Sequence, residues 1–379
     1  MKILFLAPQP FYVERGTPIA VRLAVMTLCR AGHKVDLVTF HEGKDIVEPG
    51  LTHFRISRPP FVRRVLVGFS PAKLICDLWL AATAYKLLRK NRYDIVHAVE
   101  ESIFLMFWRK RRGGFKLIYD MDSILSDQLV EKWRWLLPAL PLFKAIENMA
   151  IRRADLVLPV CQAISDRIAS VAAAKTHLLP DAAFTAEPGT ADAGEDLRAT
   201  LGIKGQMALY VGNLERYQGI DLLLASFAEI EPSCSLVIIG GNQRDIEIYR
   251  ALAVELGLSE RVHLIGPRAL ANLPDYLRQA DVLCSPRLRG VNTPMKLYSY
   301  MASGRPIIAT DIASHTQVLS HDSAVLASPT PSHFGKGLAR LLSDVDLRRT
   351  LADRAQKLVR ETYSIDAFEK RLANAYATL

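Results

Sequence analysis

Short apolar runs recur along the whole chain, and each is separated from the next by a segment long enough to form a helix. In the first half they lie at 2–7, 35–40, 94–98, 116–119 and 154–160. In the second half they lie at 207–211, 235–239, 262–265, 282–285, 307–310 and 324–327. Strands that are apolar throughout are buried on both faces, which is typical of parallel sheets covered by helices. The pattern therefore predicts an α/β fold built from doubly wound, Rossmann-like sheets.

The chain has 379 residues, which is more than one hydrophobic core usually serves. The strand–helix rhythm breaks at 182–200, a stretch that is rich in Ala, Gly, Asp and Glu and contains Pro188. We therefore expect an N-terminal domain over 1–183 and a C-terminal domain over 200–361. Residues 362–379 are expected to form a C-terminal helix that can pack back on the first domain. Two such domains would hold ligands in a shared cleft, at the carboxyl ends of their strands.

Composition excludes several classes of protein. Half of the residues are apolar and 23% are charged, as in an ordered globular protein. The sequence contains no uncharged apolar run of about 18 residues, so we expect no membrane-spanning helix. The N-terminal run lacks a cleavage site and is predicted to be a buried strand, not a signal peptide. Five cysteines without paired spacing indicate reduced core thiols of a cytoplasmic protein, not a disulfide framework or a metal site.

A formal net charge of +9 indicates an anionic partner. Nucleic acid is not favoured, because the sequence has no helix-turn-helix, zinc-finger or aromatic RNA-binding signature. Seven Lys and Arg residues occur in 61–92 against the single acid Asp77, and large apolar side chains are interleaved with them. With the basic run 109–112 and the apolar segment 133–143, this favours peripheral association with an anionic inner membrane face. The alternative is that these helices are covered by the domain core and their charges are simply solvated.

The segment 290–306 is the strongest candidate for a ligand site. It is predicted to be a loop that opens a helix, which Gly304 and Pro306 end before the strand at 307–310. Such a junction points backbone N–H groups and the positive end of the helix dipole at an anion. Lys296 lies inside the predicted helix, where its ammonium could reach a phosphate. This arrangement predicts an enzyme that holds a nucleoside diphosphate.

A second glycine-containing loop at 14–20 lies between the first strand and a helix predicted over 19–30. Gly16 would allow close approach of the backbone to a phosphate or sugar, and Thr17 could cap the helix. The alternative is a plain turn. The loop has no GxGxxG pattern, so a tightly bound dinucleotide is not expected.

The loop 210–221 contains Gly212 and Gly219 on either side of a polar stretch. Together with 290–306 it resembles glycosyltransferase family 4 on the GT-B fold. In that family a Val-Gly-Arg-Leu-x-x-x-Lys-Gly loop and a Glu-rich segment ending in Ala-x-Gly-x-Pro flank the sugar nucleotide. Further matches, in the family's order, are Ala31–His33, Tyr93–Ala98, Arg153–Val157, Ile265–Pro267 and Ala280–Leu283. The resemblance spans nearly the whole chain. It implies that 1–183 is an acceptor-side domain and that 200–361 is a nucleotide-sugar-binding domain.

The chain departs from the family at its charged positions. Asn213 and Gln218 stand where the family has its diphosphate-binding Arg and Lys, and the family's paired glutamates align on Val291 and Ser299. The segment from Asn292, Asn-Thr-Pro-x-Lys-x-Tyr, is similar to a variant subgroup with a Lys in this position. A Ser299 hydroxyl could still bond a ribose, although a plain helix surface is an equal alternative.

We infer that positive charge has moved to Arg287, Arg289 and Lys296, because a desolvated diphosphate needs compensation. Solvated arginines on a surface loop are the alternative. By the resemblance, the candidates for donor binding are Gly16, Thr17, Gly212, Asn213, Gln218, Arg268, Asn292, Thr293, Pro294 and Ser299. Arg268 would contact the base, without distinguishing uracil from guanine.

In the first half, the family often has a His after the strand at 117–119, and Asp122 lies on or near that position. Helix capping by Asp122 or Ser123 is the alternative. Asp120-x-Asp122 is also similar to the metal site of GT-A enzymes, but the rest of the chain is GT-B-like and no metal is expected. His97, with Glu100 and Glu101, would follow the preceding strand and contact substrate, unless it only satisfies neighbouring backbone groups. The catalytic candidates are Lys296, Arg287, Asp122 and His97.

The resemblance implies retaining transfer, in which the acceptor hydroxyl attacks on the face from which the nucleoside diphosphate departs. We therefore expect a hexosyltransferase that moves a sugar from a UDP- or GDP-sugar to a lipid-linked or polysaccharide acceptor in cell-envelope glycan or glycolipid synthesis. No cofactor beyond this co-substrate is expected. Two alternatives stay open: a sugar-nucleotide epimerase or phosphorylase-like enzyme on the same fold, and a catalytically degenerate scaffold or nucleotide-sugar-binding protein.

Overall fold

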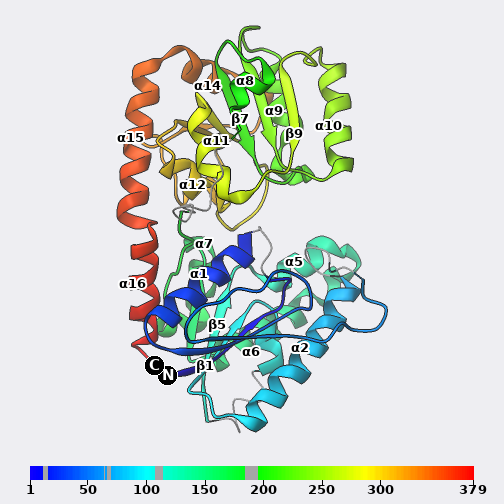
Figure 1. Ribbon diagram of the computed structural model, residues 1–379, viewed down its shortest axis with the longest axis vertical. Coiled ribbons are helices and arrows are strands. Elements are labelled where there is room, and N and C mark those ends of the chain that lie inside the picture. Colours follow the sequence, from blue (N-terminus) through cyan, green and yellow to red (C-terminus); the bar gives the residue numbers. More distant parts are fainter. Residues whose placement is uncertain (12–15, 64, 66–69, 107–113, 184–194) are drawn as a thin grey trace. The chain divides into compact units, whose positions relative to one another are not determined.

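The computed structural model describes residues 1–11, 16–63, 65, 70–106, 114–183 and 195–379. Contacts divide the chain into unit 1, which comprises Met1–Pro180 and Phe368–Leu379, and unit 2, which comprises Asp181–Ala367 (Figure 1). The basic run 109–112, most of the connection 182–200 and part of the basic segment 61–92 lie outside the described residues.

Unit 1 is built on a parallel sheet of six strands in the order β3-β2-β1-β4-β5-β6. The strands are β1 (Lys2–Ala7), β2 (Lys34–Thr39), β3 (Leu51–Arg55), β4 (Ile95–Val99), β5 (Lys116–Met121) and β6 (Leu156–Pro159). All but β3 were predicted from their apolar runs. Strand β3 lies at the sheet edge and is only partly buried, so its polar sequence Leu-Thr-His-Phe-Arg carries no continuous apolar signal.

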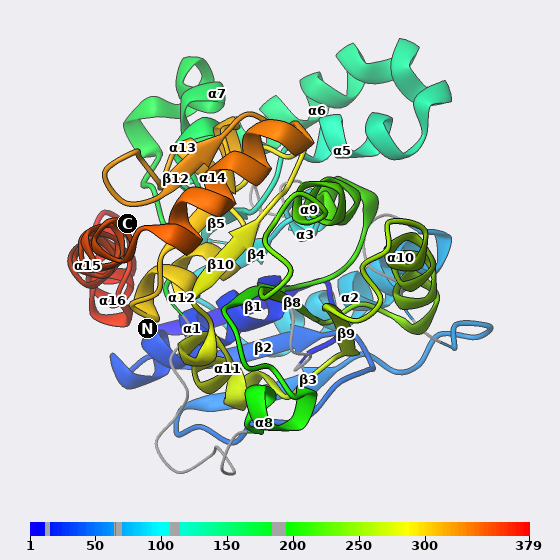
Figure 2. The ribbon, with the colours of Figure 1, turned by 90° about the horizontal axis from the view of Figure 1, so that it is seen from above.

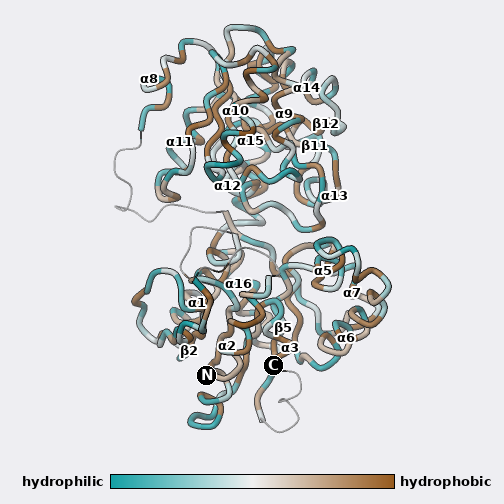
Figure 3. The backbone as a smooth tube through the Cα atoms, turned by 90° about the vertical axis from the view of Figure 1, so that its right-hand side faces the viewer, coloured by the Kyte–Doolittle hydropathy of each residue, from teal (hydrophilic) through white to brown (hydrophobic). Residues whose placement is uncertain are grey.

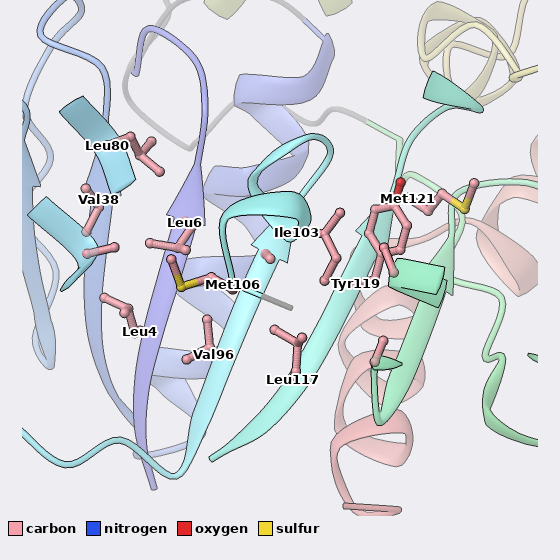
Figure 4. Close-up of a cluster of buried hydrophobic side chains, with 14 of the residues drawn as sticks. Leu4, Leu6, Val38, Leu80, Val96, Ile103, Met106, Leu117, Tyr119 and Met121 are labelled. Atoms are coloured by element: carbon pink, nitrogen blue, oxygen red, sulfur yellow. The ribbon is translucent and has the colours of Figure 1, made fainter. Parts of the chain in front are cut away.

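Helices cover both faces of this sheet. They are α1 (Gly16–Arg30), α2 (Pro71–Lys90), α3 (Ser102–Met106), α5 (Leu125–Lys132), α6 (Leu140–Arg153) and α7 (Gln162–Ala172), with the 3₁₀ turns η1 (Arg134–Ala139) and η2 (Ala173–Lys175). Figure 4 shows one face, where Leu6 and Val96 of the sheet pack with Leu80 of α2 and Ile103 of α3. The helix α16 (Ile365–Tyr376) contributes its last turns to unit 1, where Tyr376 is buried.

Unit 2 repeats the topology, with a parallel sheet in the order β12-β11-β10-β7-β8-β9. Its strands are β7 (Met207–Val211), β8 (Ser235–Ile239), β9 (Val262–Gly266), β10 (Val282–Ser285), β11 (Ile307–Thr310) and β12 (Val325–Ala327). Its helices and 3₁₀ turns are α8 (Leu197–Leu201), η3 (Arg216–Gln218), α9 (Ile220–Phe227), α10 (Gln243–Glu255), η4 (Leu270–Asn272), α11 (Leu273–Gln279), α12 (Lys296–Ala302), α13 (Ala313–Thr316), α14 (Pro331–Ser343) and α15 (Val345–Thr362).

Alternate residues of the central strands of unit 2 belong to two separate cores. Ala208 and Tyr210 pack with α9, α10 and α14 on one face, whereas Met207 and Leu209 pack with α11, α12 and α15 on the other. Figure 3 shows segments of hydrophobic residues, in brown, running through the interior of each unit. Burial on both faces explains why these strands are apolar at every position. The predicted α/β class, with two doubly wound sheets, is confirmed.

Both sheets have the Rossmann strand order. In this order the chain first adds strands on one side of the first strand and then continues on its other side. The reversal lies between β1 and β4 in unit 1, and between β7 and β10 in unit 2. At such a switch point the loops that leave the two adjacent strands diverge to opposite faces and leave space for a ligand. Each unit thus has one edge of its sheet where a ligand can bind.

Candidate functional site

At the switch point of unit 2, the loop after β7 and the loop after β10 meet. Strands β7 and β10 are neighbours, with Leu209 paired to Leu283. Gly219 adopts a φ of +71°, and a Cβ atom there would lie 2.1 Å from the carbonyl oxygen of Pro286. The Leu288 amide also donates to the carbonyl of Tyr217, at 2.8 Å. Glycine is thus required at this position, because only a residue without a side chain allows the two loops to touch.

Lys296, the first residue of α12, projects into the space between these loops. Its Nζ donates to Oε1 of Gln218 at 3.3 Å and lies 3.9 Å from the centre of the Tyr210 ring. Gly212 lies beside it, since a Cβ on Gly212 would be 3.4 Å from Nζ and 3.0 Å from the Tyr210 hydroxyl. The structure therefore brings together three residues predicted from the sequence, Lys296, Gln218 and Gly212.

Arg287 is buried and holds the loop after β10 in shape. Its guanidinium donates to the carbonyl oxygens of Arg289 at 2.6 Å and Asn292 at 3.1 Å, and to the Asn292 side-chain oxygen at 3.1 Å. It also lies over the Tyr217 ring, 5.3 Å from the ring centre. Three of its five N–H donors are thus used within the loop, and the described residues supply no hydrogen-bond acceptor for the other two.

The backbone of Arg287 is held by a buried histidine that the sequence analysis did not single out. His315 of α13 donates from Nδ1 to the Thr310 carbonyl at 2.8 Å, so its Nε2 accepts from the Ser285 hydroxyl at 3.0 Å. The Thr310 hydroxyl in turn donates to the Arg287 carbonyl. Burial lowers the pKa of His315 to about 4, so this support is neutral. No local pattern around His315 indicates this role, because its partners lie on other strands.

Two basic side chains lie close together at this edge. Burial, and then the neighbouring guanidinium of Arg287, lower the pKa of Lys296 well below its ordinary value. Burial also lowers the pKa of Arg287. Among the described residues, no carboxylate forms an ion pair with Lys296 or Arg287. Two neighbouring cations without a counter-charge are unfavourable inside a protein unless an anion joins them.

The loop that leads into α12 also carries a buried hydroxyl without a partner. Thr293 is 5% exposed, and its Oγ1 forms no hydrogen bond with any described residue. Pro294 is buried next to it. A buried polar atom left unsatisfied costs free energy and commonly marks a place where a ligand or water binds. The loop therefore offers a donor in addition to the two cations.

The other predicted donor-binding residues of unit 2 lie apart from this cluster or face the core. Asn213 is exposed, and its carbonyl accepts from the Tyr210 hydroxyl at 2.6 Å. Ser299 is buried within α12, so the alternative of a plain helix surface is wrong. Arg268 donates to Oε2 of Glu195 at 3.0 Å and to the Ile265 carbonyl at 2.6 Å. Its guanidinium is therefore already paired with an acid that the sequence analysis did not connect with it.

In unit 1, the prediction for Gly16 and Thr17 needs correction. Helix α1 begins at Gly16 and not at residue 19, so Thr17 lies inside the first turn and does not cap it from outside. Pro18 is compatible with a first helical turn, which lets the helix start earlier than the apolar pattern indicated. Gly16 is exposed and nothing lies within 4 Å of a Cβ placed on it, so the described neighbours do not require glycine there. Residues 12–15 of the loop lie outside the described part of the chain.

The expectation that His97 follows its strand and contacts substrate is also wrong. His97 lies within β4, is completely buried and stacks on Phe5 at 4.1 Å between ring centres. Its Nδ1 is 2.7 Å from the Tyr376 hydroxyl and its Nε2 is 3.0 Å from Oδ2 of Asp120. Both ring nitrogens are therefore used, which makes His97 a residue that ties α16 to the sheet. The sequence could not indicate this, because Tyr376 lies 279 residues away.

The carboxyl edge of β4 and β5 holds a buried acidic cluster. Lys73 pairs with Glu101, and the Ser123 hydroxyl donates to both carboxylate oxygens of Glu100, at 3.0 and 2.8 Å. Glu100 has a φ of +50°, which is uncommon for a residue with a side chain. Burial raises the pKa of Glu100 and of the nearby Asp77 to about 8 each, with the Glu101 charge as the next cause.

Strand β5 extends to Met121, so Asp122 directly follows it and is half-buried. It precedes α5, whose N-cap is Ile124, and so it is not the cap of that helix. The described residues contain no group of three or more His, Cys, Asp or Glu side chains arranged to hold a metal ion. All five cysteines are buried free thiols.

Two family models match the chain. "Glycosyltransferase Family 4" matches residues 16–183, and "Glycosyl transferases group 1" matches residues 205–344. A D-inositol 3-phosphate glycosyltransferase of Corynebacterium urealyticum is 31% identical over 207 residues, which cover 51% of this chain and 48% of the relative. The chain thus spans about half the length of that relative.

Solved structures show the same architecture over the whole chain. Sucrose-phosphate synthase from Thermosynechococcus elongatus aligns with a TM-score of 0.80 and 21% identity, covering 100% of this chain and 98% of that one. HepE of Anabaena, solved in complex with UDP, aligns with a TM-score of 0.77 and 18% identity, and the alignment covers both chains completely. The two family models, with the doubly wound sheets they fall on, show that this chain belongs to the glycosyltransferases of the GT-B fold.

Proposed function

We propose that the protein transfers a hexose, with retention of configuration, from a UDP- or GDP-sugar to a lipid-linked or polysaccharide acceptor in cell-envelope glycan or glycolipid synthesis. The observation that carries this proposal is the pair of basic side chains, the half-buried Lys296 and the buried Arg287, which lie together beside the switch point of unit 2. A nucleotide sugar carries its negative charge on the diphosphate, which would supply the missing counter-charge. HepE, which shares the fold, binds UDP and UDP-glucose, and this supports a nucleotide-sugar donor here.

In this proposal, the residues of the chain act by position and charge. Lys296 and the two unused N–H donors of Arg287 bind the diphosphate and stabilise the negative charge that grows on the leaving phosphate. The Thr293 hydroxyl adds a hydrogen bond. The departing phosphate takes the acceptor proton, so no protein nucleophile is needed. Binding the two substrates in the orientation of the reaction lowers the barrier further, because less entropy is then lost in the transition state.

The acceptor is proposed to bind unit 1, where the loops after β4 and β5 carry Glu100, Ser123 and Asp122. A carboxyl–hydroxyl pair such as Glu100 and Ser123 can accept hydrogen bonds from a sugar or lipid hydroxyl and donate hydrogen bonds to it. The expected outcome of Ser123→Ala is a raised KM for the acceptor with little change in donor binding. An unchanged KM would remove this edge from the acceptor site.

Association with a membrane surface is proposed from the exposed apolar side chains of η1 and α6. Trp135 is 76% exposed on η1, and Leu142, Ile146 and Met149 are exposed along α6. The spacing of these three residues places them on one face of the helix. An exposed apolar patch of this kind, next to basic residues, suits the interface of an anionic bilayer. Figure 2 shows α5 and α6 side by side, extending from the rest of unit 1. The described residues include no helix that is both long and apolar enough to cross a bilayer.

Sedimentation with vesicles tests this association. The wild-type protein should sediment with vesicles that contain phosphatidylglycerol, and Trp135→Ser with Leu142→Ser should reduce the bound fraction severalfold. Ile248→Ser is a matched control, because Ile248 is an exposed apolar residue of α10 in unit 2. Equal loss in the control, or no binding by the wild type, would contradict the proposed surface.

The activity itself is tested with a panel of UDP-, GDP- and ADP-sugars, by measuring release of the nucleoside diphosphate with and without a membrane extract. Release that increases with the extract supports a transferase with a lipid-linked or glycan acceptor. Binding of nucleotide without any release would favour the second candidate, a degenerate scaffold, which the absence of the family's paired glutamates keeps open.

A further inference from the structure

The environment of the Lys296 side chain is unusually poor in groups that can stabilise an ammonium. The one hydrogen-bond acceptor that the described residues offer its Nζ is the neutral amide of Gln218, at 3.3 Å. The other group against Nζ is the face of the Tyr210 ring, which stabilises a cation far less than a carboxylate does. A buried ammonium normally retains its proton through an ion pair. Here the described part of the chain places no carboxylate in an ion pair with it.

The titratable groups around Lys296 come from four elements. Tyr210 lies on β7, Cys284 on β10, Arg287 in the loop after β10, and His315 on α13. Of these, only Arg287 is charged at neutral pH, and it has the same sign as an ammonium. Burial raises the pKa of Cys284 to about 12, and burial raises the pKa of Tyr210 well above its ordinary value, so neither becomes an anion. Every neighbour therefore either leaves an ammonium uncompensated or repels it.

We propose that the diphosphate of the donor binds together with a proton, because the Lys296 amine is neutral in the free protein and becomes an ammonium only when a phosphate oxygen lies beside it. The proton comes from solvent, one N–H bond forms on Nζ, and no other covalent bond changes. This inference rests on the proposed function, since it assigns the linkage to the nucleotide-sugar site of unit 2. It adds that Lys296 gains its charge only when the ligand binds, whereas Arg287 is charged beforehand.

The physical reason is the balance between desolvation and pairing. In the free site, a second cation next to Arg287 has no partner, so losing a proton is the less costly state. A diphosphate brings two or more negative charges and restores the charged form through hydrogen bonds to ionised groups. Affinity should then fall by about tenfold per pH unit while the free amine is neutral and the bound one is charged.

Calorimetric titration with UDP at pH 8 measures this linkage. At that pH the terminal phosphate of UDP is already ionised, because a phosphate monoester loses its second proton near pH 6. The apparent binding enthalpy is compared between HEPES and Tris, which differ in ionisation enthalpy. Its dependence on buffer gives the number of protons taken up. We expect about one proton per UDP in the wild-type protein.

Lys296→Arg is the decisive variant, since a guanidinium stays charged at all accessible pH values and so should bind UDP without taking up a proton. Its affinity should be almost independent of pH between 7 and 9, whereas that of the wild type should fall. Lys296→Gln should lose both the proton uptake and most of the affinity. If the arginine variant does not fold, as judged by circular dichroism, the glutamine variant and the wild-type buffer dependence decide.

The outcomes separate the inference from the function on which it rests. UDP binding with no buffer dependence in the wild type would overturn the proton linkage and leave the donor site intact. Equal proton uptake in the wild type and in Lys296→Arg would also overturn it, because another group such as His315 would then be the acceptor. Failure of UDP and GDP to bind at all would overturn the proposed function together with the inference.

Discussion

Gly290→Ala is the substitution that tests most directly how the loop after β10 is held. Gly290 has a φ of +124°, outside the left-handed helical region that side chains sometimes adopt. A Cβ atom built there would lie 2.0 Å from Nη2 and 2.6 Å from Cζ of Arg287. The guanidinium would have to leave its place, and with it some of its hydrogen bonds to Arg289 and Asn292.

The expected loss of stability is the sum of the backbone strain and the lost hydrogen bonds. Forcing a side chain into a disallowed backbone conformation costs about 1–3 kcal/mol. Loss of a hydrogen bond from a charged donor costs about 1.5–3 kcal/mol, and at least one of the three bonds of Arg287 must break. Gly290→Ala should therefore destabilise the protein by about 3–5 kcal/mol and also weaken UDP binding.

Urea unfolding followed by circular dichroism gives the free-energy difference when the slope is unchanged. Gly202→Ala is the matched control in unit 2. Gly202 has a φ of +66° and nothing lies within 4 Å of a Cβ placed on it, so the control measures backbone strain alone, at about 1–2 kcal/mol.

The double variant Arg287→Ala/Gly290→Ala removes the atoms that clash, so its cost should be smaller than the sum of the two single changes. A cost for Gly290→Ala no greater than that of Gly202→Ala would refute the reasoning, as would full additivity.

Three further outcomes are expected. Lys296→Ala should lower kcat by about 10²-fold, as the loss of one preorganised electrostatic group does, whereas Lys336→Ala, at an exposed lysine of unit 2, should leave turnover unchanged. Asp77, whose folded pKa of about 8 lies above its unfolded value, stabilises the protein at low pH and loses this contribution as pH rises from about 4 towards 8. Urea unfolding of Asp77→Asn should therefore show a small gain over the wild type at pH 5 and a larger one, on the order of a few kcal/mol, at pH 8.5, and a gain that is equal at both values would contradict the buried ionisation. Tyr376→Phe should lower the unfolding free energy by about 1–3 kcal/mol, because it leaves a buried nitrogen of His97 without its partner, and an unchanged midpoint would show that this bond contributes little.

The sequence alone was sufficient for every strand except β3 and for the class of fold. The predicted runs at 207–211, 235–239, 282–285 and 307–310 coincide with β7, β8, β10 and β11. These strands are buried on both faces, so nearly all of their residues are apolar and the signal is local. The loop that leads to Lys296 was also predicted from local sequence, because glycine, proline and a lysine at a strand–helix junction form a pattern within a few residues. The half-buried edge strand β3 was not predicted, since its burial depends on a neighbour and not on its own composition.

Only the tertiary structure decided what the polar side chains do. The sequence around Arg287 did not indicate that its guanidinium would form hydrogen bonds within its own loop. It also did not indicate that His315 would hold the neighbouring strand residue Thr310. His97 lies inside the sheet, and the hydrogen-bond partner of its Nδ1 is Tyr376, from the other end of the chain. Burial, and then Arg287, lower the pKa of Lys296. Part of its surroundings comes from Tyr210 and Gln218, which lie more than 70 residues earlier in the chain. Hydrophobic periodicity is set by adjacent residues, whereas desolvation and hydrogen bonding are set by whatever the fold brings from elsewhere.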